Sequence, residues 1–314
     1  MCLLVGKYER NVTLKSRTWI KRGGLVGIWL LPECIEELIQ NVKNLYSQSA
    51  DFVVIGQTSN TYFKDTFNID YVVDTKKLIA FEVVDDSTLM CECGVPMARV
   101  SRYCIENGIS GYEGMINLPG TVGGAIYGNA GCYGCEISKV LKYVEILTCD
   151  GKILIVKNDE LGFDFRNSVL KRGDLRGVIL RGYFDISLRK SPEELREIAD
   201  TNTIDRKRAQ DPPAHNLGTT VNFSGLKKNL RNLVVRSLGK LLKPFHLNER
   251  QNYRMRKFVI CLLYGKMRVL PYISDVRMGC FMWKDSYADQ VFPAYLELMQ
   301  QVYNNTSIEI EIRS

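Results

Sequence analysis

Apolar positions near the start of the chain repeat with the period of a helix and then switch to a short β-branched run. Within residues 32–47, one helical face carries the apolar side chains of Ile35, Leu38, Ile39, Val42 and Leu45. The run at residues 52–55 follows after a short gap. The pattern predicts a helix, then a strand, and then a turn at residues 56–60.

The same kind of periodicity predicts further helices and strands up to about residue 209. Helices are expected at residues 97–107 and 192–209, and the second begins at Pro192, a residue favoured in the first turn of a helix. Asp150 and Gly151 predict a tight turn, so the strands on either side should form a hairpin. The strands expected in this part lie at residues 78–84, 89–93, 141–148, 153–157 and 178–186.

The composition changes after residues 211–213, where a basic segment begins. Between residues 227 and 257, ten of the 31 residues are Lys or Arg, and Glu249 is the one acidic residue. This imbalance indicates a separate basic subdomain. A helix over about residues 287–303 and a final strand at residues 307–313 are expected to follow.

Length and composition limit the class of protein. At 314 residues and 46% hydrophobic content, the chain is long enough for two or three subdomains and has the composition of a folded soluble protein. Its formal net charge of +7 suits an anionic ligand such as a nucleotide as well as nucleic acid. No apolar run reaches the length of a membrane span, the start is too short for a secretory signal, and the ten cysteines fit reduced thiols better than a disulfide framework. We therefore expect a cytoplasmic protein without a transmembrane segment.

Glycine is concentrated between residues 111 and 140, with apolar residues in between. Because glycine has no Cβ, it permits positive φ and lets backbone amides approach a phosphate or a flat ring. We therefore expect an ordered cofactor loop here rather than a linker. No G-x-G-x-x-G opens a helix after a strand, which argues against a Rossmann dinucleotide site.

Four blocks of the sequence occur in the order found in a known family. They are WIKRGG at residues 19–24, VVIGQTSNTYF at residues 53–63, PGTVGGAIYGNAG at residues 119–131 and FDFRNS at residues 163–168. In these blocks the chain resembles the UDP-N-acetylenolpyruvoylglucosamine reductases (UDP-N-acetylmuramate dehydrogenases), flavoproteins of the vanillyl-alcohol-oxidase and p-cresol-methylhydroxylase type. The second block is similar to the family's strand and its G-G-G-S/T-N loop.

The resemblance is nearly continuous up to residue 189, and beyond it only residues 206–219 and 309–313 match. It implies an α+β fold with two FAD-binding subdomains and a smaller substrate-binding subdomain. Expected boundaries are residues 1–75 and 76–211 for the FAD-binding subdomains, residues 212–303 for the basic substrate-binding subdomain, and residues 304–314 for a C-terminal strand that returns to the active site. Positive charge in the substrate subdomain suits the diphosphate of a nucleotide sugar.

Two glycine-bearing loops are expected to bind FAD, because loops after strands can present backbone N–H groups to its phosphates. The resemblance also implies that the second loop runs beside the isoalloxazine ring. In the first loop the expected cofactor-binding residues are Ile55, Gly56, Gln57, Thr58, Ser59, Asn60 and Thr61. In the second they are Pro119, Gly120, Thr121, Gly123, Gly124, Gly128, Asn129, Ala130, Gly131 and Ile137.

The resemblance implies a reaction in two halves. NADPH reduces FAD, which then reduces the enolpyruvyl double bond of a UDP-linked amino sugar in cell-wall precursor synthesis, while a hydroxyl group protonates the neighbouring carbon. Negative charge builds next to a carboxylate, so the second half needs a fixed cation and a positioned acid. Arg166 matches the family's cation, Glu311 matches its carboxylate partner, and Thr219 stands at the place of its proton-donating serine.

Each catalytic assignment has an alternative. Thr219 keeps the hydroxyl, but its extra methyl group restricts the rotamer, and a shifted alignment would place Thr220 there instead. Arg166 could be an ordinary ion-pair residue. Glu311 could form an exposed pair with Glu309 on a strand, where alternate residues share a face.

Other candidate residues carry weaker signals. Tyr133, Arg206 and Arg208 are candidates for substrate contact, although such residues more often pack or remain solvated. Cys132 and Cys135 form a C-x-x-C motif, but no second pair has the spacing of a zinc site, and the chain has only two histidines. We expect no metal, and we interpret both cysteines as small side chains in a tight loop, with thiol redox chemistry as the alternative.

Two other functions stay open. A paralogue could use the same flavin on a different nucleotide sugar in surface-polysaccharide synthesis, and the diverged residues 220–279 would also fit a non-catalytic FAD-binding protein. The basic segment could instead be a solvated helix pair, or it could dock to nucleic acid or an anionic membrane. Its few aromatic residues, Phe245 and Tyr253, argue against specific nucleic-acid binding.

Overall fold

The chain folds into two compact units. The computed structural model describes residues 4–212, 214–241 and 248–314, so the expectation for Phe245 lies outside the described residues. Unit 1 consists of Met1–Ser16, Leu25–Thr58 and Asn68–Asp205. Unit 2 consists of Arg17–Gly24, Ser59–Phe67 and Arg206–Ser314. The expected α+β class is confirmed, whereas the finer boundaries at residues 75, 211 and 303 stay a prediction.

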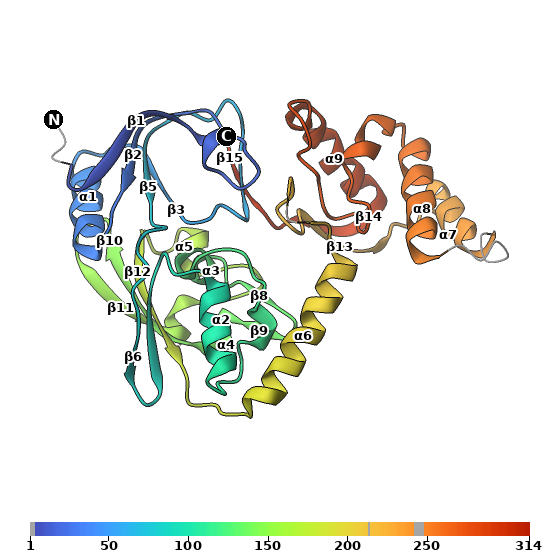
Figure 1. Cartoon of the computed structure of the whole chain (residues 1–314). Coiled ribbons are helices and arrows are strands. Elements are labelled where there is room, and N and C mark those ends of the chain that lie inside the picture. Colours follow the sequence, from blue (N-terminus) through green and yellow to red (C-terminus); the bar gives the residue numbers. More distant parts are fainter. Residues whose placement is uncertain (1–3, 213, 242–247) are drawn as a thin grey trace. The chain divides into compact units, whose positions relative to one another are not determined.

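The first sheet of unit 1 has four strands in the order β1-β2-β5-β3 (Figure 1). The strands β2 (Leu25–Leu31), β5 (Ile69–Asp74) and β3 (Phe52–Ile55) are parallel, and β1 (Lys7–Thr13) pairs with β2 antiparallel. Helix α1 (Ile35–Ser47) connects β2 to β3 and buries the predicted apolar face in the core. Burial of that face is what holds the helix on the sheet.

The second sheet of unit 1 is antiparallel throughout, in the order β11-β10-β12-β7-β6. Its strands are β6 (Phe81–Asp85), β7 (Thr88–Glu92), β10 (Leu141–Thr148), β11 (Ile153–Lys157) and β12 (Gly177–Asp185). The predicted hairpin around Asp150 and Gly151 is confirmed, and Gly151 has the positive φ of 81° that the turn requires. The five predicted strands are present, with ends shifted by up to three residues.

Short helices cover this sheet and carry the glycine-rich segment. Helix α3 contacts β12, where Gly182 leaves room for Ile126, because a Cβ at that position would lie 2.7 Å from its Cδ1. The helices and turns of unit 1 are η1 (Leu14–Ser16), α2 (Met97–Glu106), η2 (Glu113–Met115), α3 (Val122–Tyr127), α4 (Ile137–Val140), η3 (Asn158–Leu161) and α5 (Val169–Arg172), with the paired segments β8 (Gly131–Cys132) and β9 (Cys135–Glu136). Helix α6 (Pro192–Ala209) has the predicted bounds and runs across the division into units.

The described part of unit 2 contains three α-helices, a 3₁₀ helix and two small sheets. Its helices are α7 (Leu230–Leu241), α8 (Glu249–Leu263), η5 (Met267–Tyr272) and α9 (Ala288–Val302). Its core is aromatic, and the ring of Phe292 lies 5.3 Å from both Trp283 and Tyr62. Among the described residues, no helix of either unit combines the length and the apolar character needed to cross a membrane.

The single final strand expected at residues 307–313 is wrong. Two strands are present instead: β14 (Tyr303–Ile308) pairs antiparallel with β13 (Val221–Leu226), and β15 (Glu311–Arg313) pairs parallel with β4 (Thr61–Phe63). Between them, the backbone N of Glu309 donates to the carbonyl of Thr220, and the Ile310 side chain is buried in the core. The chain therefore changes its pairing partner at this point.

Three segments of unit 2 contact one another through the buried side chain of Arg22. Arg22 is 7% exposed; its Nη1 lies 3.7 Å from Oδ2 of Asp65, and its Nε lies 3.6 Å from Oδ1 of Asp289. Its Nη2 donates to the carbonyl of Asp285. Burial raises the pKa of Asp289, and the charge of Arg22 opposes this rise. The arginine therefore compensates two carboxylates that come from different parts of the chain.

Replacing Arg22 by Met should destabilise the protein by about 3 kcal/mol or more, because it removes the buried cation that faces the two partly buried carboxylates of Asp65 and Asp289. Urea unfolding measures the loss. Asp289→Asn in the Arg22→Met background should recover part of it, since it removes one of those charges. Equal stability of wild type and Arg22→Met would contradict this account of the Arg22 contacts.

Candidate functional site

The two glycine loops expected to bind FAD lie against each other in unit 1. The first begins after β3, and Oε1 of Gln57 accepts a hydrogen bond of 2.8 Å from the backbone N of Gly120. A Cβ on Gly56 would come within 2.3 Å of Oγ1 of Thr121. The loops approach this closely only because residue 56 has no side chain.

The first loop has threonine rather than glycine at position 58, where the backbone conformation favours glycine. Thr58 stands in the stretch that resembles the G-G-G-S/T-N loop, and its φ is 55°, in the left-handed region. A β-branched residue is strained there. Strain of this kind persists only where surrounding contacts hold it, and it is frequent at ligand-binding segments.

The glycines of the second loop fall into two groups. A Cβ on Gly123 would lie 3.0 Å from the nearest neighbouring atom, and one on Gly131 would lie 2.4 Å away, so both allow the chain to pack on itself. A Cβ on Gly124 would meet nothing nearer than 3.8 Å, and one on Gly128 nothing nearer than 3.6 Å. Packing within the protein does not explain glycine at positions 124 and 128, whereas close approach of a bound group would.

Other expected cofactor residues support the loop through contacts within the protein. Asn129 donates from Nδ2 to Oε1 of Glu136 at 2.8 Å and to the carbonyl of Asp164 at 3.0 Å, and its Oδ1 accepts from the backbone N of Ser138 at 3.0 Å. The Ile137 side chain is buried in the core. These side chains shape the loop, and their direct contact with a cofactor stays a prediction.

The remaining expected cofactor residues differ in exposure. Buried ones are Ile55, Thr58, Thr121 and Gly131; partly exposed ones are Gly56, Gln57, Ser59, Thr61, Gly120, Gly123, Gly128 and Ala130; exposed ones are Asn60, Pro119 and Gly124. The first loop crosses the division of the chain, since residues 59–61 belong to unit 2.

Arg166 lies on a tight turn beside the second loop. Asp164 and Asn167 exchange both backbone hydrogen bonds, at 3.2 and 3.0 Å, so Phe165 and Arg166 occupy a two-residue turn. Arg166 has a positive φ of 53°, and its Nη2 donates to the carbonyl of Gly131 at 2.7 Å. The structure thus brings the expected cation to the backbone of the expected cofactor loop.

The C-x-x-C motif forms a hairpin. Its turn residues, Tyr133 and Gly134, both have positive φ, and Tyr133 is 39% exposed. Both cysteines contact Gly114: Cys132 donates from Sγ to the Gly114 carbonyl at 2.9 Å, and Sγ of Cys135 accepts from the Gly114 backbone N at 3.2 Å. Burial raises the pKa of Cys135 to about 11, so this thiol is neutral near pH 7 and a poor nucleophile. Within the described ranges, no group of three His, Cys, Asp or Glu residues could hold a metal ion.

The two threonines considered as proton donors in unit 2 have different environments. Thr220 is fully buried; its Oγ1 accepts from the backbone N of Phe281 at 3.1 Å, and its own backbone N donates to the carbonyl of Gly279 at 2.7 Å. Thr219 is partly exposed, and its Oγ1 accepts from Nη1 of Arg277 at 3.3 Å. The Thr220 hydroxyl therefore serves packing, whereas the Thr219 residue keeps partial exposure.

Glu311 is held by the short β15 strand. Its backbone N donates to the carbonyl of Asn60 at 2.9 Å, in the parallel pairing that sets Glu311 opposite Thr61. The Glu311 side chain is 21% exposed, and its Oε2 lies 3.5 Å from Nη2 of Arg313. Glu309 lies outside both neighbouring strands, so the alternative of an exposed pair on one strand is wrong.

The arginines of α6 differ from each other. Arg206 donates from Nε to Oε1 of Gln210 at 3.1 Å, and its Nη1 is buried without a hydrogen-bond partner among the described residues. Arg208 is exposed. Sequence reasoning missed Arg277, because no motif marks it and only the tertiary structure places it beside Thr219.

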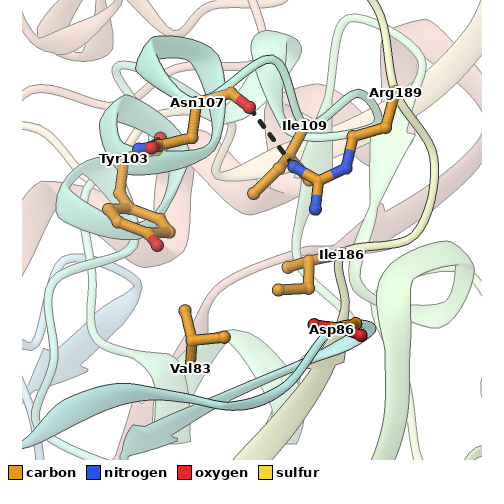
Figure 2. A pocket seen from close by; sticks show the side chains of 7 residues that line it. All are labelled: Val83, Asp86, Tyr103, Asn107, Ile109, Ile186 and Arg189. Carbon is orange, nitrogen blue, oxygen red and sulfur yellow. Dashed lines mark hydrogen bonds between the residues drawn. The ribbon is translucent and has the colours of Figure 1, made fainter.

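One surface pocket of unit 1 lies apart from these residues (Figure 2). It is lined by Val83, Asp86, Tyr103, Asn107, Ile109, Ile186 and Arg189, none of which was an expected site residue. Arg189 donates from Nη1 to the carbonyl of Asn107 at 3.3 Å. The glycine loops, rather than this pocket, carry the features of a cofactor site.

Comparison with known proteins places the chain among the FAD-binding proteins. Residues 27–157 match the model of a family described as FAD binding domain. The segment includes both glycine loops and most of unit 1. The class of protein is therefore an FAD-binding α+β protein, as the sequence predicted.

Curated relatives narrow this class. The UDP-N-acetylenolpyruvoylglucosamine reductase of Caldicellulosiruptor saccharolyticus is 30% identical over 207 residues, which cover 66% of this chain and 66% of that protein. The enzyme of the same name from Exiguobacterium sibiricum is 30% identical over 216 residues, which cover 66% of this chain and 70% of that protein. The chain belongs to the UDP-N-acetylenolpyruvoylglucosamine reductase family, whose members are FAD-dependent oxidoreductases.

A solved structure supports the fold over a greater length. The UDP-N-acetylenolpyruvylglucosamine reductase of Thermus caldophilus gives a TM-score of 0.67 at 20% identity and covers 98% of this chain and 99% of its own. At this identity the likeness concerns the fold alone. The curated sequence matches span about two thirds of this chain and of the relatives, so the fold extends further than the clear sequence similarity.

The residues present fit FAD. The two loops that the family match includes are in contact, and Gly124 and Gly128 leave the backbone open where packing does not require it. Backbone amides and glycines of this kind suit a pyrophosphate and a planar ring. The loops from Gly56 to Thr58 and from Gly120 to Gly128 are the parts of unit 1 that would hold the cofactor.

Gly124→Ala and Gly128→Ala test this fit. Each Cβ finds ordinary van der Waals space in the protein, and alanine within α3 should raise stability by about 0.5–1 kcal/mol at position 124. We therefore expect unchanged or higher stability of the cofactor-free protein, with FAD affinity lowered at least about tenfold, a loss of roughly 1.4 kcal/mol. Calorimetric titration of each variant with FAD measures the affinity.

Gly225→Ala is the matched control, because a Cβ at that position also meets no close neighbour but lies on β13 in unit 2. Its FAD affinity should equal that of the wild type. Full FAD affinity in both Gly124→Ala and Gly128→Ala would show that the cofactor does not approach the backbone at these positions.

Proposed function

We propose that the protein is an NADPH-dependent flavoenzyme that reduces the enolpyruvyl group of a UDP-linked amino sugar. The observation that carries this proposal is the family membership, with the FAD-binding segment at residues 27–157, together with the contact between the two loops of that segment. When bound, FAD would supply the two-electron chemistry that connects NADPH to the enolpyruvyl double bond. The protein itself must bind the sugar, stabilise charge and deliver a proton.

Arg166 is proposed as the cation for this chemistry. Reduction of the double bond builds negative charge on the carbon next to the substrate carboxylate, and a guanidinium can stabilise that charge. Its hydrogen bond to the carbonyl of Gly131 and its position on a two-residue turn hold the side chain over the cofactor loop. A fixed cation of this kind needs no reorganisation during the reaction.

Thr219 and Glu311 are proposed as the acid and the accompanying carboxylate in unit 2. The partial exposure of Thr219, compared with the buried Thr220, supports Thr219 as the residue that protonates the neighbouring carbon. Glu311 projects from a strand that is fixed by its pairing with β4. Tyr133, Arg206 and Arg208 remain candidates for substrate contact, with the buried and unpartnered Nη1 of Arg206 as the best supported of these.

The absorbance of the purified, FAD-loaded protein tests the function under anaerobic conditions. NADPH should bleach the flavin absorbance, and UDP-N-acetylglucosamine enolpyruvate should restore it. Arg166→Lys should leave the first step unchanged and slow the second by about 10²-fold or more, because the planar guanidinium that meets a carboxylate is lost. The rates of both steps come from stopped-flow absorbance.

A second candidate function is reduction of another nucleotide sugar. It is favoured by the limited span of the sequence matches, which cover 66% of the chain in the two relatives above. Bleaching by NADPH without recovery on addition of the enolpyruvyl sugar would support this candidate and reject the proposed substrate. A protein that takes up no FAD would reject both.

Thr219→Ala should slow the step that restores flavin absorbance by about 10²- to 10⁴-fold, the usual contribution of a general acid. Thr219→Ser keeps the hydroxyl and should retain or exceed the wild-type rate. Thr220→Ala should instead lower the thermal stability, since it removes the acceptor of the Phe281 backbone N.

A wild-type rate in Thr219→Ala would exclude Thr219 as the acid. A large rate loss in a stable Thr220→Ala variant would transfer the role to Thr220. Stopped-flow rates and thermal melts of the three variants separate these outcomes, because the first reports chemistry and the second reports packing.

A further inference from the structure

Arg277 lies directly beside the hydroxyl of Thr219 in unit 2. Its Nη1 donates to Oγ1 of Thr219 at 3.3 Å. The preceding Gly218 has a positive φ of 76°, and a Cβ at that position would lie 4.0 Å from Nη2 of Arg277. The guanidinium therefore lies along the turn formed by Gly218 and Thr219.

The loop that carries Arg277 is fixed to the segment that carries Thr219. Ile273 and Phe281 pair at the base of this loop, and the backbone N of Arg277 donates to Oγ of Ser274 at 3.0 Å. The carbonyl of Gly279 then accepts from the backbone N of Thr220 at 2.7 Å. These hydrogen bonds hold the loop of Arg277 beside the segment of Thr219, within reach of the Arg277 side chain.

The Arg277 guanidinium forms no ion pair within the described part of the chain. No carboxylate oxygen there lies within 4.0 Å of its guanidinium, and its Nε is buried without a hydrogen-bond partner. Its neighbour Cys280 is a neutral thiol, because burial raises the pKa of this residue to about 11. The guanidinium thus donates to the Thr219 hydroxyl without an ion pair to a carboxylate, and its positive charge lies at Thr219.

These contacts have a chemical consequence for a threonine that acts as an acid. Arginine has only donors, so the bond from Nη1 occupies a lone pair of Oγ1 and directs the O–H proton of Thr219 elsewhere. When this proton passes to a substrate carbon, the electron pair of the O–H bond stays on Oγ1 as an alkoxide. A cation at hydrogen-bond distance stabilises that alkoxide until water returns the proton.

We propose that Arg277 is a positioning residue for proton donation, which holds the Thr219 hydroxyl in one rotamer and stabilises its alkoxide. The inference rests on the proposed function and extends it to a residue outside every motif. It also accounts for threonine at this position: the added methyl group limits the rotamers, and Arg277 selects among those that remain.

The test uses the FAD-loaded full-length protein with Arg277→Met and Arg277→Lys. Arg277→Met should slow restoration of the flavin absorbance by the enolpyruvyl sugar by about 10- to 100-fold, less than the loss of the general acid itself, and should increase the solvent deuterium isotope effect. Bleaching by NADPH should be unchanged. Arg277→Lys should recover part of the rate, since it keeps the charge but not the guanidinium.

Two further measurements separate positioning from a merely structural role. The affinity for the UDP-linked lactyl product, measured by calorimetry, should stay within about twofold of wild type, since Arg277 acts on the acid. In the Thr219→Ala background, Arg277→Met should cause less than about twofold further loss, because the two residues act as a unit. Arg268→Met, which removes an exposed arginine of the same unit, is the control and should behave as wild type.

The outcomes that overturn the inference differ from those that overturn the function. A wild-type protein that never responds to the enolpyruvyl sugar removes the proposed function itself. A responsive wild type with an equally fast Arg277→Met variant rejects Arg277 alone. Fully additive losses in Thr219→Ala/Arg277→Met, or a product affinity that falls in parallel with the rate, would show that Arg277 acts independently of Thr219.

Discussion

The structure of unit 1 depends on a close approach of three backbone segments that only glycine permits. A Cβ on Gly94 would lie 1.9 Å from the carbonyl oxygen of Thr75, and one on Gly56 would lie 2.3 Å from the Thr121 side chain. The backbone N of Gly123 donates to the carbonyl of Cys93 at 2.8 Å in the same region. The ends of both sheets and the start of α3 meet here because side chains are missing.

The same approach brings together the two loops of the candidate cofactor site. Once Gln57 accepts from Gly120, the first loop and the second loop become one surface rather than two independent turns. The hydrogen bonds of Asn129 then fix the following hairpin, and Arg166 reaches back to the carbonyl of Gly131. The cation proposed for catalysis is therefore positioned by the same segment that would hold FAD.

In unit 2 the C-terminal segment pairs with two different strands in succession. The C-terminal segment leaves β13 after Ile308 and joins β4 at Glu311, which sets the carboxylate beside a strand from the first quarter of the sequence. In the same unit, the hydrogen bonds between Thr220 and the Gly279 loop bring Arg277 to Thr219. Both candidate catalytic groups of this unit thus depend on contacts between residues distant in sequence.

The sequence by itself determined the local elements and the family. The periodic face of α1, the hairpin around Gly151 and the glycines of the second loop are properties of neighbouring residues, so they could be predicted, as could the FAD-binding fold from motif order. The break between β14 and β15, the different burial of Thr219 and Thr220, and the place of Arg277 could not. They depend on which distant backbone groups meet, because hydrogen bonds and burial between distant segments leave no periodic signal in the sequence.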